Sequence, residues 1–592
     1  MQAAEWLETS ILDLEVLIVD CQTTGATPEQ GCVLELGWCV AQARQVGPAP
    51  TAHAHWIALP EGRRVSSVVR QLTGFHEGVL ANALRPEEAW QRLRASLPAP
   101  ASAPSPVPTA IHFARFELAF LRDWSRRFDP AGAFPIDAVC VHAIACRLFP
   151  ELPRRNLRAL AGFLGHGVDL ERRALGHVVA TAFIWRKLAA SLAERGIRSW
   201  AELTGWLATP PDPRASPRKR TYPMPSTRHR ELPDGPGVYR LLRSNGDVLY
   251  VGKAKSLRKR VASHFGKQRG ATERALEMLT QVSDVEYEAT ATALEAALLE
   301  TALIKALAPP YNVQLVVQGD RGGWFASSDL ASTDCKPDER HPLGPLPGRF
   351  SVRSLRAVVE LATGEAPSLA RRAAATGAPR TFAPDDQSFA AGWSRFAERR
   401  LGGLPCPPEE ARRRIMMVAR GLLLGAGEIA ELDEDAGDLV GDPAAEVGAD
   451  APSAASAGPI WDAARVCRHL ERSLAGNYQV LRRSSWLCVL ASSSVSYREP
   501  RDRAGRLLRL EAAELVEAAD MADGPDGPLP TPAPGKARRA LQLAFDAARY
   551  DRLRILTSEL KRIDRDGGQI AVRLSRTHLL RGARLRNILR LV

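Results

Sequence analysis

Three stretches of low apolar content interrupt this chain of 592 residues and confine each compact domain to the sequence between them. Residues 201–230, above all from 208 onward, are rich in Pro, Ser and Arg, and residues 523–535 are rich in Pro and Gly. Residues 427–459 contain nine Asp or Glu and no Lys or Arg. Such compositions bury too little apolar surface to fold, so we predict linkers there. The fold class predicted is multidomain, with α/β and α+β parts joined by disordered linkers.

The composition between these stretches is that of an ordinary globular protein. Hydrophobic residues make up 45% and charged residues 25% of the chain. The longest apolar runs fall far short of the ~20 residues that span a bilayer, and the first residues carry acids and no basic segment. The nine cysteines are scattered without a C-x-x-C pair, which is typical of a reducing cytoplasm. We expect a cytoplasmic protein without a membrane partner or a small-molecule cofactor.

Positive charge is concentrated in two parts of the chain. The formal net charge is +12, and residues 533–592 contain fifteen Lys or Arg against five Asp or Glu. Residues 216–330 contain seventeen against twelve. An excess of this kind favours a polyanionic partner, and DNA is the partner we predict.

The first block, residues 1–200, alternates strand-like and helix-like segments and is predicted to be an α/β domain. Residues 15–20 and 31–41 have the length and apolar content of strands. Helical spacing of apolar residues follows at 86–97, 112–124, 156–165 and 172–192.

Four motifs of this block follow one another in a characteristic order: VDCQTTG at 19–25, RQLTGF at 70–75, HFARFE at 112–117 and RRALGH at 172–177. They resemble the motifs of the DnaQ-like, DEDD-type 3′–5′ exonucleases. The resemblance implies an RNase H-like fold in which carboxylates hold two metal ions.

Several positions depart from the exonuclease pattern. Asp20 keeps the first carboxylate, but Gln22 replaces a glutamate, Glu117 replaces an aspartate, Arg172 stands at the general-base histidine and His177 at the last aspartate. Two neighbouring divalent cations need several carboxylates to offset their charge, and an arginine cannot act as a base near neutral pH. We therefore predict a vestigial exonuclease site. A register with His166 and Glu171 at the base position is disfavoured by the Arg-Ala-Leu match.

The second block, residues 231–318, opens with a predicted β-hairpin. Residues 237–239 and 249–252 read as two strands joined by a Ser-Asn-Gly-Asp turn. A basic helix follows, then a third strand in VEYEAT, a helix over 293–307 and the sequence PPYN. These motifs, in this order, resemble the GIY-YIG nuclease domain of UvrC and Cho-type excision-repair endonucleases.

The resemblance implies a catalytic set for metal-dependent phosphodiester hydrolysis. Glu300 matches the family's metal ligand, with Mg²⁺ or Mn²⁺ as the expected cofactor, since Mg²⁺ takes few protein carboxylates. Arg260 matches the arginine that stabilises charge at phosphorus. The remaining catalytic positions are Tyr239, Tyr250, Lys253, His264 and Asn312, with His264 at a position that is often Tyr in the family.

Three further cations of the basic helix are predicted to contact DNA phosphates. They are Lys255, Arg258 and Lys259, on the helix that also carries Arg260. Glu295 precedes Glu300 by five residues and is expected to point elsewhere.

The remaining sequence shows no motif of known chemistry. Residues 319–426 are predicted to be mixed and mainly helical, 427–459 an acidic linker, and 460–592 a basic α+β region that begins with a hairpin at 478–499. Its many arginines are compatible with nucleic-acid binding.

The combined motifs predict a DNA-repair endonuclease that cuts through its GIY-YIG domain in nucleotide excision repair. Its partners would be DNA and a damage-recognition complex. Two alternatives remain: a 3′–5′ exonuclease working at Asp20 and Glu117, as in the DNA polymerase III epsilon subunit, and a non-catalytic DNA-binding repair adaptor. Gln22 and Arg172 speak against the first, and the Arg260–Glu300 pair against the second.

Overall fold

The computed structural model groups the chain into two compact units. The first contains Met1–Ala293 and Pro309–Asn312, and the second contains Leu294–Ala308 and Val313–Val592. The structure describes residues 5–592 except 46–49, 99–105, 170–171, 211–220, 267–271, 314, 316–322, 327–329, 331, 335–337, 347–351, 403–404, 406, 430–459, 501, 503, 522–524, 526 and 533–546. The acidic linker predicted at 427–459 thus lies outside the described residues, apart from the end of α14 (Pro408–Ile429).

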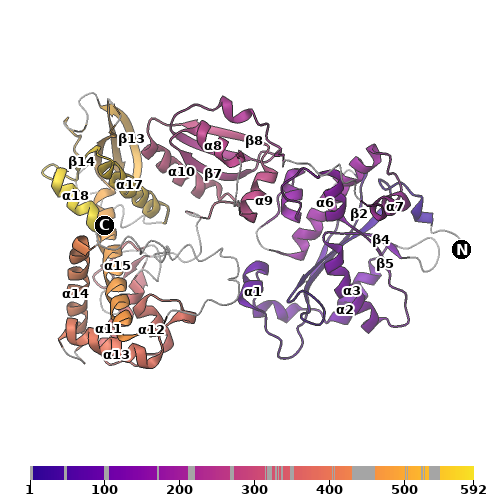
Figure 1. Cartoon of the computed structure of the whole chain (residues 1–592), viewed down its shortest axis with the longest axis horizontal. Helices are drawn as coiled ribbons and strands as arrows, with labels where there is room; N and C mark the ends of the chain where they lie inside the picture. Colours follow the sequence, from indigo (N-terminus) through magenta and orange to yellow (C-terminus); the bar gives the residue numbers. More distant parts are fainter. Residues whose placement is uncertain are drawn as a thin grey trace. The chain divides into compact units, whose positions relative to one another are not determined.

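A five-stranded mixed sheet forms the centre of the first domain (Figure 1). Its order is β3 (His53–Trp56), β2 (Val33–Gln42), β1 (Glu15–Thr23), β4 (Val107–Ile111) and β5 (Ile136–Cys140). Strand β2 is antiparallel to both of its neighbours, whereas β1, β4 and β5 run parallel. This is the RNase H-like arrangement implied by the motifs.

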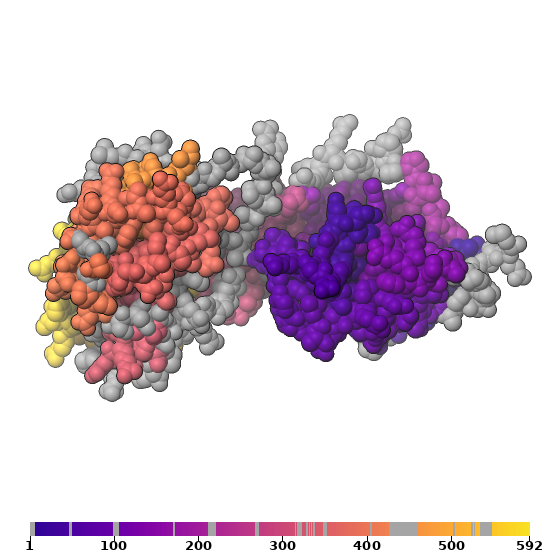
Figure 2. Space-filling model, turned by 90° about the horizontal axis from the view of Figure 1, so that it is seen from below, coloured from indigo at the N-terminus to yellow at the C-terminus, as the bar shows by residue number. Residues whose placement is uncertain are grey.

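Helices cover both faces of this sheet because both faces of β1 are apolar. Val16 and Ile18 join the core formed with α4 (Val141–Leu148), α5 (Leu157–Phe163) and α6 (Ala174–Glu194). Leu17 and Val19 join the core formed with α2 (Pro86–Ala95) and α3 (Ala114–Phe128). The indigo-to-violet residues of this domain form one continuous surface in Figure 2.

The linker predicted at 201–230 is shorter than expected. Helix α7 (Trp200–Ala208) continues the first domain, started by a capping box between Ser199 and Glu202. At the other end, Met224 is buried in the core of the next domain, just before the short helix η4 (Arg228–Glu231). The described residues therefore restrict any linker to the interval between these segments.

A three-stranded antiparallel sheet carries the GIY-YIG motifs, in the order β7 (Val248–Ala254), β6 (Gly237–Leu242) and β8 (Asp284–Ala289). The predicted hairpin and third strand are confirmed. Its turn uses Gly246 at φ +89° and Asn245, whose side-chain oxygen accepts from the backbone N–H of Asp247. Helices α8 (Leu257–Phe265) and α9 (Glu273–Gln281) pack on the sheet through Leu257, Val261 and Leu279.

A polar network joins α9 to the RNase H-like domain within the first unit. Glu277 accepts hydrogen bonds from Asn156 Nδ2 at 2.7 Å, Arg158 Nη1 at 3.2 Å and the Tyr311 hydroxyl at 2.6 Å. A Cβ atom on Gly162 of α5 would lie 2.0 Å from the Gln281 side-chain oxygen. The two domains are thus in close contact at this point.

The second unit begins with a helical region, as predicted. It contains α11 (Arg353–Ala362), α12 (Leu369–Thr376), α13 (Asp386–Phe396), the π-helical turn η7 (Ala397–Leu401), α14 and α15 (Ala463–Leu490) around one core. The hairpin predicted at 478–499 is wrong, because α15 continues to Leu490. Buried Leu470, Leu474 and Leu481 share one face at helical spacing and pack into the helical core, whereas Trp486, Leu487 and Leu490 pack into the core of the C-terminal sheet. This packing overrides the β-branched and aromatic residues nearby.

A five-stranded antiparallel sheet completes the second unit, in the order β13 (Glu514–Met521), β12 (Gly505–Glu511), β11 (Ser494–Arg498), β14 (Gln569–Arg573) and β15 (Leu579–Arg581). Its core also contains α17 (Ala547–Arg565), α18 (Gly582–Leu591) and residues of α10 (Ala293–Leu307). In the predicted linker 523–535, Leu529 packs against Leu507 and Ala571 of this sheet.

The two units also contain several smaller elements. They are η1 (Glu5–Leu7), α1 (Ser67–Thr73), η2 (Glu77–Asn82), β9 (Trp324–Phe325), β10 (Thr333–Asp334) and η6 (Arg380–Phe382). Among the described helices, none has both the length and the apolar character needed to cross a membrane.

Candidate active site

Three aromatic rings from β6, β7 and α8 meet on the GIY-YIG sheet. The ring centroids of Tyr239, Tyr250 and His264 lie 5.6 to 6.1 Å apart. The Tyr239 hydroxyl lies 2.7 Å from His264 Nε2, and the Tyr239 side chain is fully buried. The structure thus brings together three residues that the sequence predicted as catalytic.

The Arg260 guanidinium belongs to the same cluster. The neighbouring phenols of Tyr239 and Tyr250 raise the pKa of Arg260 by their charge and hydrogen bonds. In turn, burial, followed by the Arg260 charge, lowers the pKa of His264 to about 4. His264 is therefore neutral at pH 7, and its unprotonated ring nitrogen can accept a hydrogen bond.

Gly252 makes room for this cluster. It pairs with Tyr239 in the β6–β7 register, and a Cβ atom there would lie 2.6 Å from the Tyr239 hydroxyl oxygen and 2.7 Å from the Tyr250 ring. A glycine inside a strand is a sign of such a close approach. The sequence reading placed Gly252 in the strand but missed this role.

Gly252→Ala is expected to displace the Tyr239 phenol from His264. We expect the substitution to cost about 1–3 kcal/mol of stability, because the methyl group has no space. DNA cleavage should fall with it by about tenfold or more. Circular dichroism and a cleavage time course measure the two effects. Gly246→Ala in the hairpin turn is the control, because a Cβ there meets nothing within 4 Å and acts only through its positive φ. Equal cleavage losses in both variants would contradict the role given to Gly252.

The buried, neutral state of His264 also predicts a pH dependence of stability. Its folded pKa of about 4 lies below the ordinary value of 6.5, so the unfolded chain binds more protons between these pH values. The contribution of His264 to the free energy of unfolding should therefore fall by about 3 kcal/mol as the pH drops from about 7.5 to 4, and it should be constant above that range. Urea unfolding at each pH tests this. His264→Gln should show a decline about 3 kcal/mol smaller than wild type, because buried His112, with a pKa of about 3, adds a decline of its own. Exposed His76→Gln should retain the full wild-type decline.

The other predicted catalytic residues occupy different surroundings. Lys253 lies half-buried on β7. Asn312 holds the same strand, because its side chain accepts from the Val251 N–H at 3.0 Å and donates to the Val251 carbonyl at 2.9 Å. Glu300 lies half-buried on α10, in the second unit. The catalytic roles of these three residues, like those of Tyr239, Tyr250, Arg260 and His264, remain predictions.

The predicted phosphate contacts divide into two kinds. Lys255 and Lys259 are exposed, and Lys259 pairs loosely with Asp234 at 3.7 Å. Arg258 also has an internal contact, because its Nε donates to the Leu232 carbonyl at 2.9 Å. All three residues are exposed, and Arg258 is the one whose side chain is also held from within the domain.

The four exonuclease-type residues at the end of β1 also meet. Asp20 lies 2.6 Å from the Gln22 amide nitrogen and 3.1 Å from His177 Nδ1. Glu117 accepts from the Cys21 N–H at 3.2 Å. Burial, and then the nearby Asp20 carboxylate, raises the pKa of Glu117 well above its ordinary value. Arg172 lies exposed before α6 and is held by its backbone N–H to the Leu72 carbonyl.

This donor set does not suit two hard divalent cations. An amide and an imidazole already contact the Asp20 carboxylate, and Glu117 favours its neutral form. Two such ions require several ionised carboxylates. His166, the base position in the alternative register, instead stacks on Phe183 with ring centroids 4.9 Å apart.

His112 opens the HFARFE motif and directly follows β4, and the motif alone did not predict a role for it. It is 5% exposed, and neither ring nitrogen has a hydrogen-bond partner among the described residues. Burial and the nearby His142 and His177 lower its pKa to about 3. The following Phe113 adopts φ +63° and is 47% exposed.

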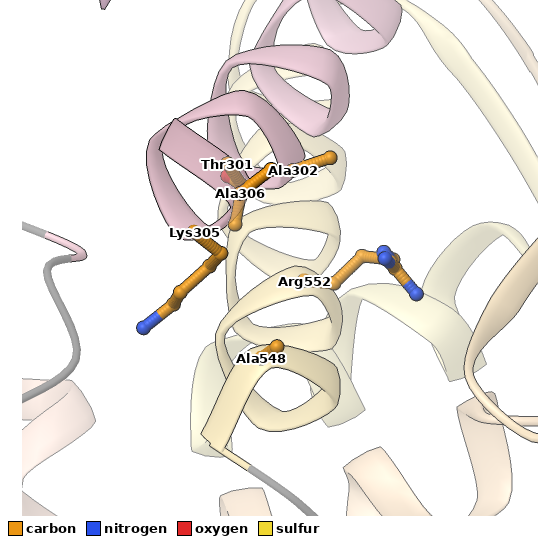
Figure 3. A pocket seen from close by; sticks show the side chains of 6 residues that line it. All are labelled: Thr301, Ala302, Lys305, Ala306, Ala548 and Arg552. Carbon is orange, nitrogen blue, oxygen red and sulfur yellow. The ribbon is translucent and has the colours of Figure 1, made fainter. Parts of the chain in front are cut away.

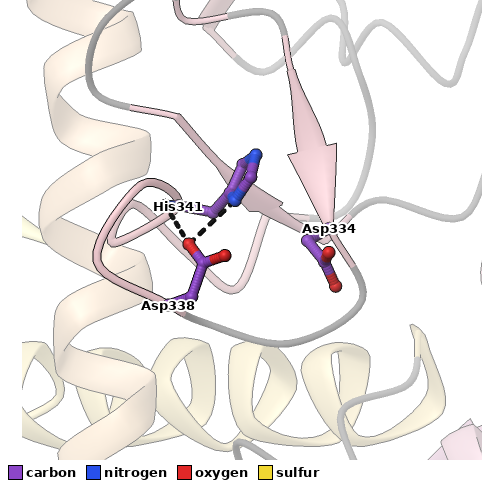
Figure 4. A group of neighbouring side chains, drawn as sticks. All are labelled: Asp334, Asp338 and His341. Carbon is purple, nitrogen blue, oxygen red and sulfur yellow. Dashed lines mark hydrogen bonds and ion pairs between the residues drawn. The ribbon is translucent and has the colours of Figure 1, made fainter.

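Asp334, Asp338 and His341 form a third cluster, in the second unit (Figure 4). Within the described residues it is the group whose ligand atoms all lie within 4.8 Å of one another. Asp338 already accepts from His341 Nδ1 at 2.8 Å and from the backbone N–H groups of Arg340 and His341. These contacts are those of a surface turn.

Comparison with known proteins identifies a UvrC-like GIY-YIG domain at residues 235–313. A Mycobacterium tuberculosis protein named as a candidate bifunctional exonuclease/endonuclease is 29% identical over 380 residues, which are 61% of this chain and 55% of the relative. UvrABC system protein C of Legionella pneumophila is 42% identical over 131 residues, or 21% of each chain. The magnesium-bound N-terminal GIY-YIG domain of Thermotoga maritima UvrC is 32% identical, covering 14% of this chain and 92% of that domain, with a TM-score of 0.13.

The chain therefore contains a GIY-YIG endonuclease domain of the UvrC type behind a domain with the RNase H-like sheet. This domain class is that of metal-dependent nucleases of DNA repair. The GIY-YIG recognition made from the motifs is confirmed, and the first block has the sheet order of the RNase H-like fold that its motifs implied. The chain spans about half the length of the M. tuberculosis relative and about a fifth of the Legionella protein.

Proposed function

We propose that this protein is a metal-dependent DNA endonuclease that cuts one strand internally through its GIY-YIG domain. The observation that carries the proposal is the cluster of Tyr239, His264 and Arg260, in which a neutral imidazole lies 2.7 Å from a phenol beside a permanent cation. A hydrogen-bonded pair that can orient a nucleophile and a cation that can stabilise charge at phosphorus are suited to phosphodiester hydrolysis.

The chain's own residues take distinct roles in this proposal. Tyr239 and its hydrogen-bonded partner His264 are proposed to orient the attacking water. Arg260 binds phosphate oxygens as their charge grows, with paired hydrogen bonds that a lysine cannot make. Tyr250 and Gly252 keep the cluster in shape, and Lys255 and Lys259 contact flanking phosphates.

Glu300 is the residue proposed to hold Mg²⁺ or Mn²⁺. A single carboxylate is sufficient for Mg²⁺, which fills its remaining positions with water and phosphate oxygens. When bound, the ion supplies a Lewis acid that stabilises negative charge on the phosphate.

The proposed substrate is damaged or distorted DNA, acted on in the cytoplasm within a repair complex. The support is the similarity to UvrC-type domains and the basic exposed helix α8. The RNase H-like domain is proposed to serve as a structural partner of the nuclease domain rather than as an exonuclease, because its carboxylates are already engaged.

One assay tests this proposal against both alternatives. A bubble or adducted duplex, labelled internally and at each end, is incubated with Mg²⁺ or Mn²⁺ and with wild type, Glu300→Ala or Asp20→Ala, alone and with a damage-recognition complex. We expect a single internal nick that is lost in Glu300→Ala and kept in Asp20→Ala. Laddering from a 3′ end that depends on Asp20 would show an exonuclease. Binding without any cleavage, even in the complex, would show an adaptor.

A further inference from the structure

The C-terminal region, residues 486–592, contacts helix α10 near both ends of the helix. Glu295 accepts from Arg506 Nε at 2.8 Å and from the Tyr497 hydroxyl at 3.3 Å, and Lys305 Nζ lies 2.6 Å from Asp551 Oδ2. The four charged side chains are only 10% to 18% exposed. These ion pairs are mostly buried, so breaking either leaves an uncompensated charge.

Apolar contacts connect the two ion pairs along the helix. Leu294 and Leu298 belong to the core that the C-terminal sheet forms with α15, α17 and α18. Farther along, small side chains of α10 and α17 line a cavity of about 260 Å³, with Lys305 and Arg552 pointing to opposite sides (Figure 3). One whole face of α10 is therefore occupied by the C-terminal region.

Glu300 lies on the other face of this helix. An α-helix turns by about 100° per residue, which places Glu300 about 160–200° from Leu298 and Ala302. The residues that anchor α10 and the carboxylate proposed to bind the metal are thus on opposite sides. The C-terminal region thus contacts the helix through side chains that point away from Glu300.

We propose that residues 486–592 act as the positioning element for the metal ligand of the nuclease, with Arg506 and Asp551 as positioning residues. This gives a function to the region in which the sequence shows no motif. The inference rests on the proposed function, because it takes Glu300 as the metal ligand. A carboxylate on a firmly held helix binds a cation without first losing the entropy of ordering that helix.

The test uses the full chain with Arg506→Met and, independently, Lys305→Met. The matched control is Arg509→Met on the same strand, whose partner Glu517 lies 3.4 Å away in a more exposed pair. Two quantities are measured: hydrogen exchange of the peptide covering 293–307, and Mn²⁺ binding by electron paramagnetic resonance, counted as the part that Glu300→Gln abolishes.

We expect both test variants to exchange at least roughly tenfold faster in α10 and to bind Mn²⁺ at least roughly fivefold more weakly. Arg509→Met should behave as wild type, and the swapped pair Glu295→Arg with Arg506→Glu should recover part of both properties. Wild-type values for Arg506→Met would overturn the proposal. So would faster exchange with unchanged Mn²⁺ affinity, since the region would then be only structural. Failure of the proposed function is distinguishable, because wild type itself would then show no Glu300-dependent Mn²⁺ binding or cleavage.

Discussion

Replacing Arg260 with alanine is expected to lower the rate of DNA cleavage by about 10²–10³, the usual effect of removing one donor that stabilises transition-state charge. The guanidinium lies beside the phenols of Tyr239 and Tyr250, so the variant removes the cation from the centre of the cluster. Arg260→Lys should recover only a small part, because a lysine keeps the charge but loses the planar fork.

Single-turnover cleavage at saturating enzyme measures this effect separately from DNA binding. Arg240→Ala is the control, because Arg240 lies on β6 of the same sheet and pairs with a half-exposed Glu286 at 3.0 Å. Its rate should stay within about threefold of wild type, as expected for a partly exposed pair. An Arg260→Ala rate equally close to wild type would remove Arg260 from the mechanism.

Glu277→Ala is expected to destabilise the first unit by about 3–5 kcal/mol, the usual cost of removing one partner of a buried ion pair. Arg158 and Tyr311 would lose the carboxylate that both contact, and Asn156 would lose a hydrogen-bond acceptor. Arg158 is 19% and Glu277 13% exposed, so water cannot replace these contacts fully. Tyr311 precedes Asn312, so strand β7 should loosen as well.

Urea unfolding of the full chain, with hydrogen exchange followed in α5 and α9, measures the loss. Glu286→Ala serves as the control, since Glu286 is 53% exposed and should cost less than about 1 kcal/mol. Equal stability of the two variants would mean that the network does not join the domains energetically. A large loss of stability in Glu277→Ala would mean that the RNase H-like domain, despite its altered catalytic carboxylates, stabilises the nuclease domain.

Local patterns predicted the GIY-YIG domain well. The hairpin, the third strand and the helix at 293–307 all occur at the predicted residues, because each depends on turn chemistry or on apolar spacing within one segment. The sequence patterns gave a wrong prediction where the local composition of a segment is compatible with both a strand and a helix. Residues 478–490 are helical because Leu481 packs into the helical core while Trp486, Leu487 and Leu490 pack into the core of the C-terminal sheet, and the local composition does not reveal either partner.

The candidate site was predictable only in part. Asp20, Gln22, Glu117 and His177 meet as the motif order implied, and so do Tyr239, Tyr250, Arg260 and His264. The contact that Gly252 permits, and the neutral state of His264, depend on distances of a few tenths of an ångström and on burial. Neither quantity is encoded in the identity of a single residue.

The sequence by itself determined which chemistry this protein carries, because each nuclease motif is a short run whose order and spacing survive without the fold. Only the tertiary structure decided what supports that chemistry. Arg506 reaches Glu295 across 211 positions, and Arg158 reaches Glu277 across 119. An apolar or charged pattern identifies the face of a helix that is buried, but many other segments offer an equally suitable partner. The choice among them is made by simultaneous packing of the whole unit.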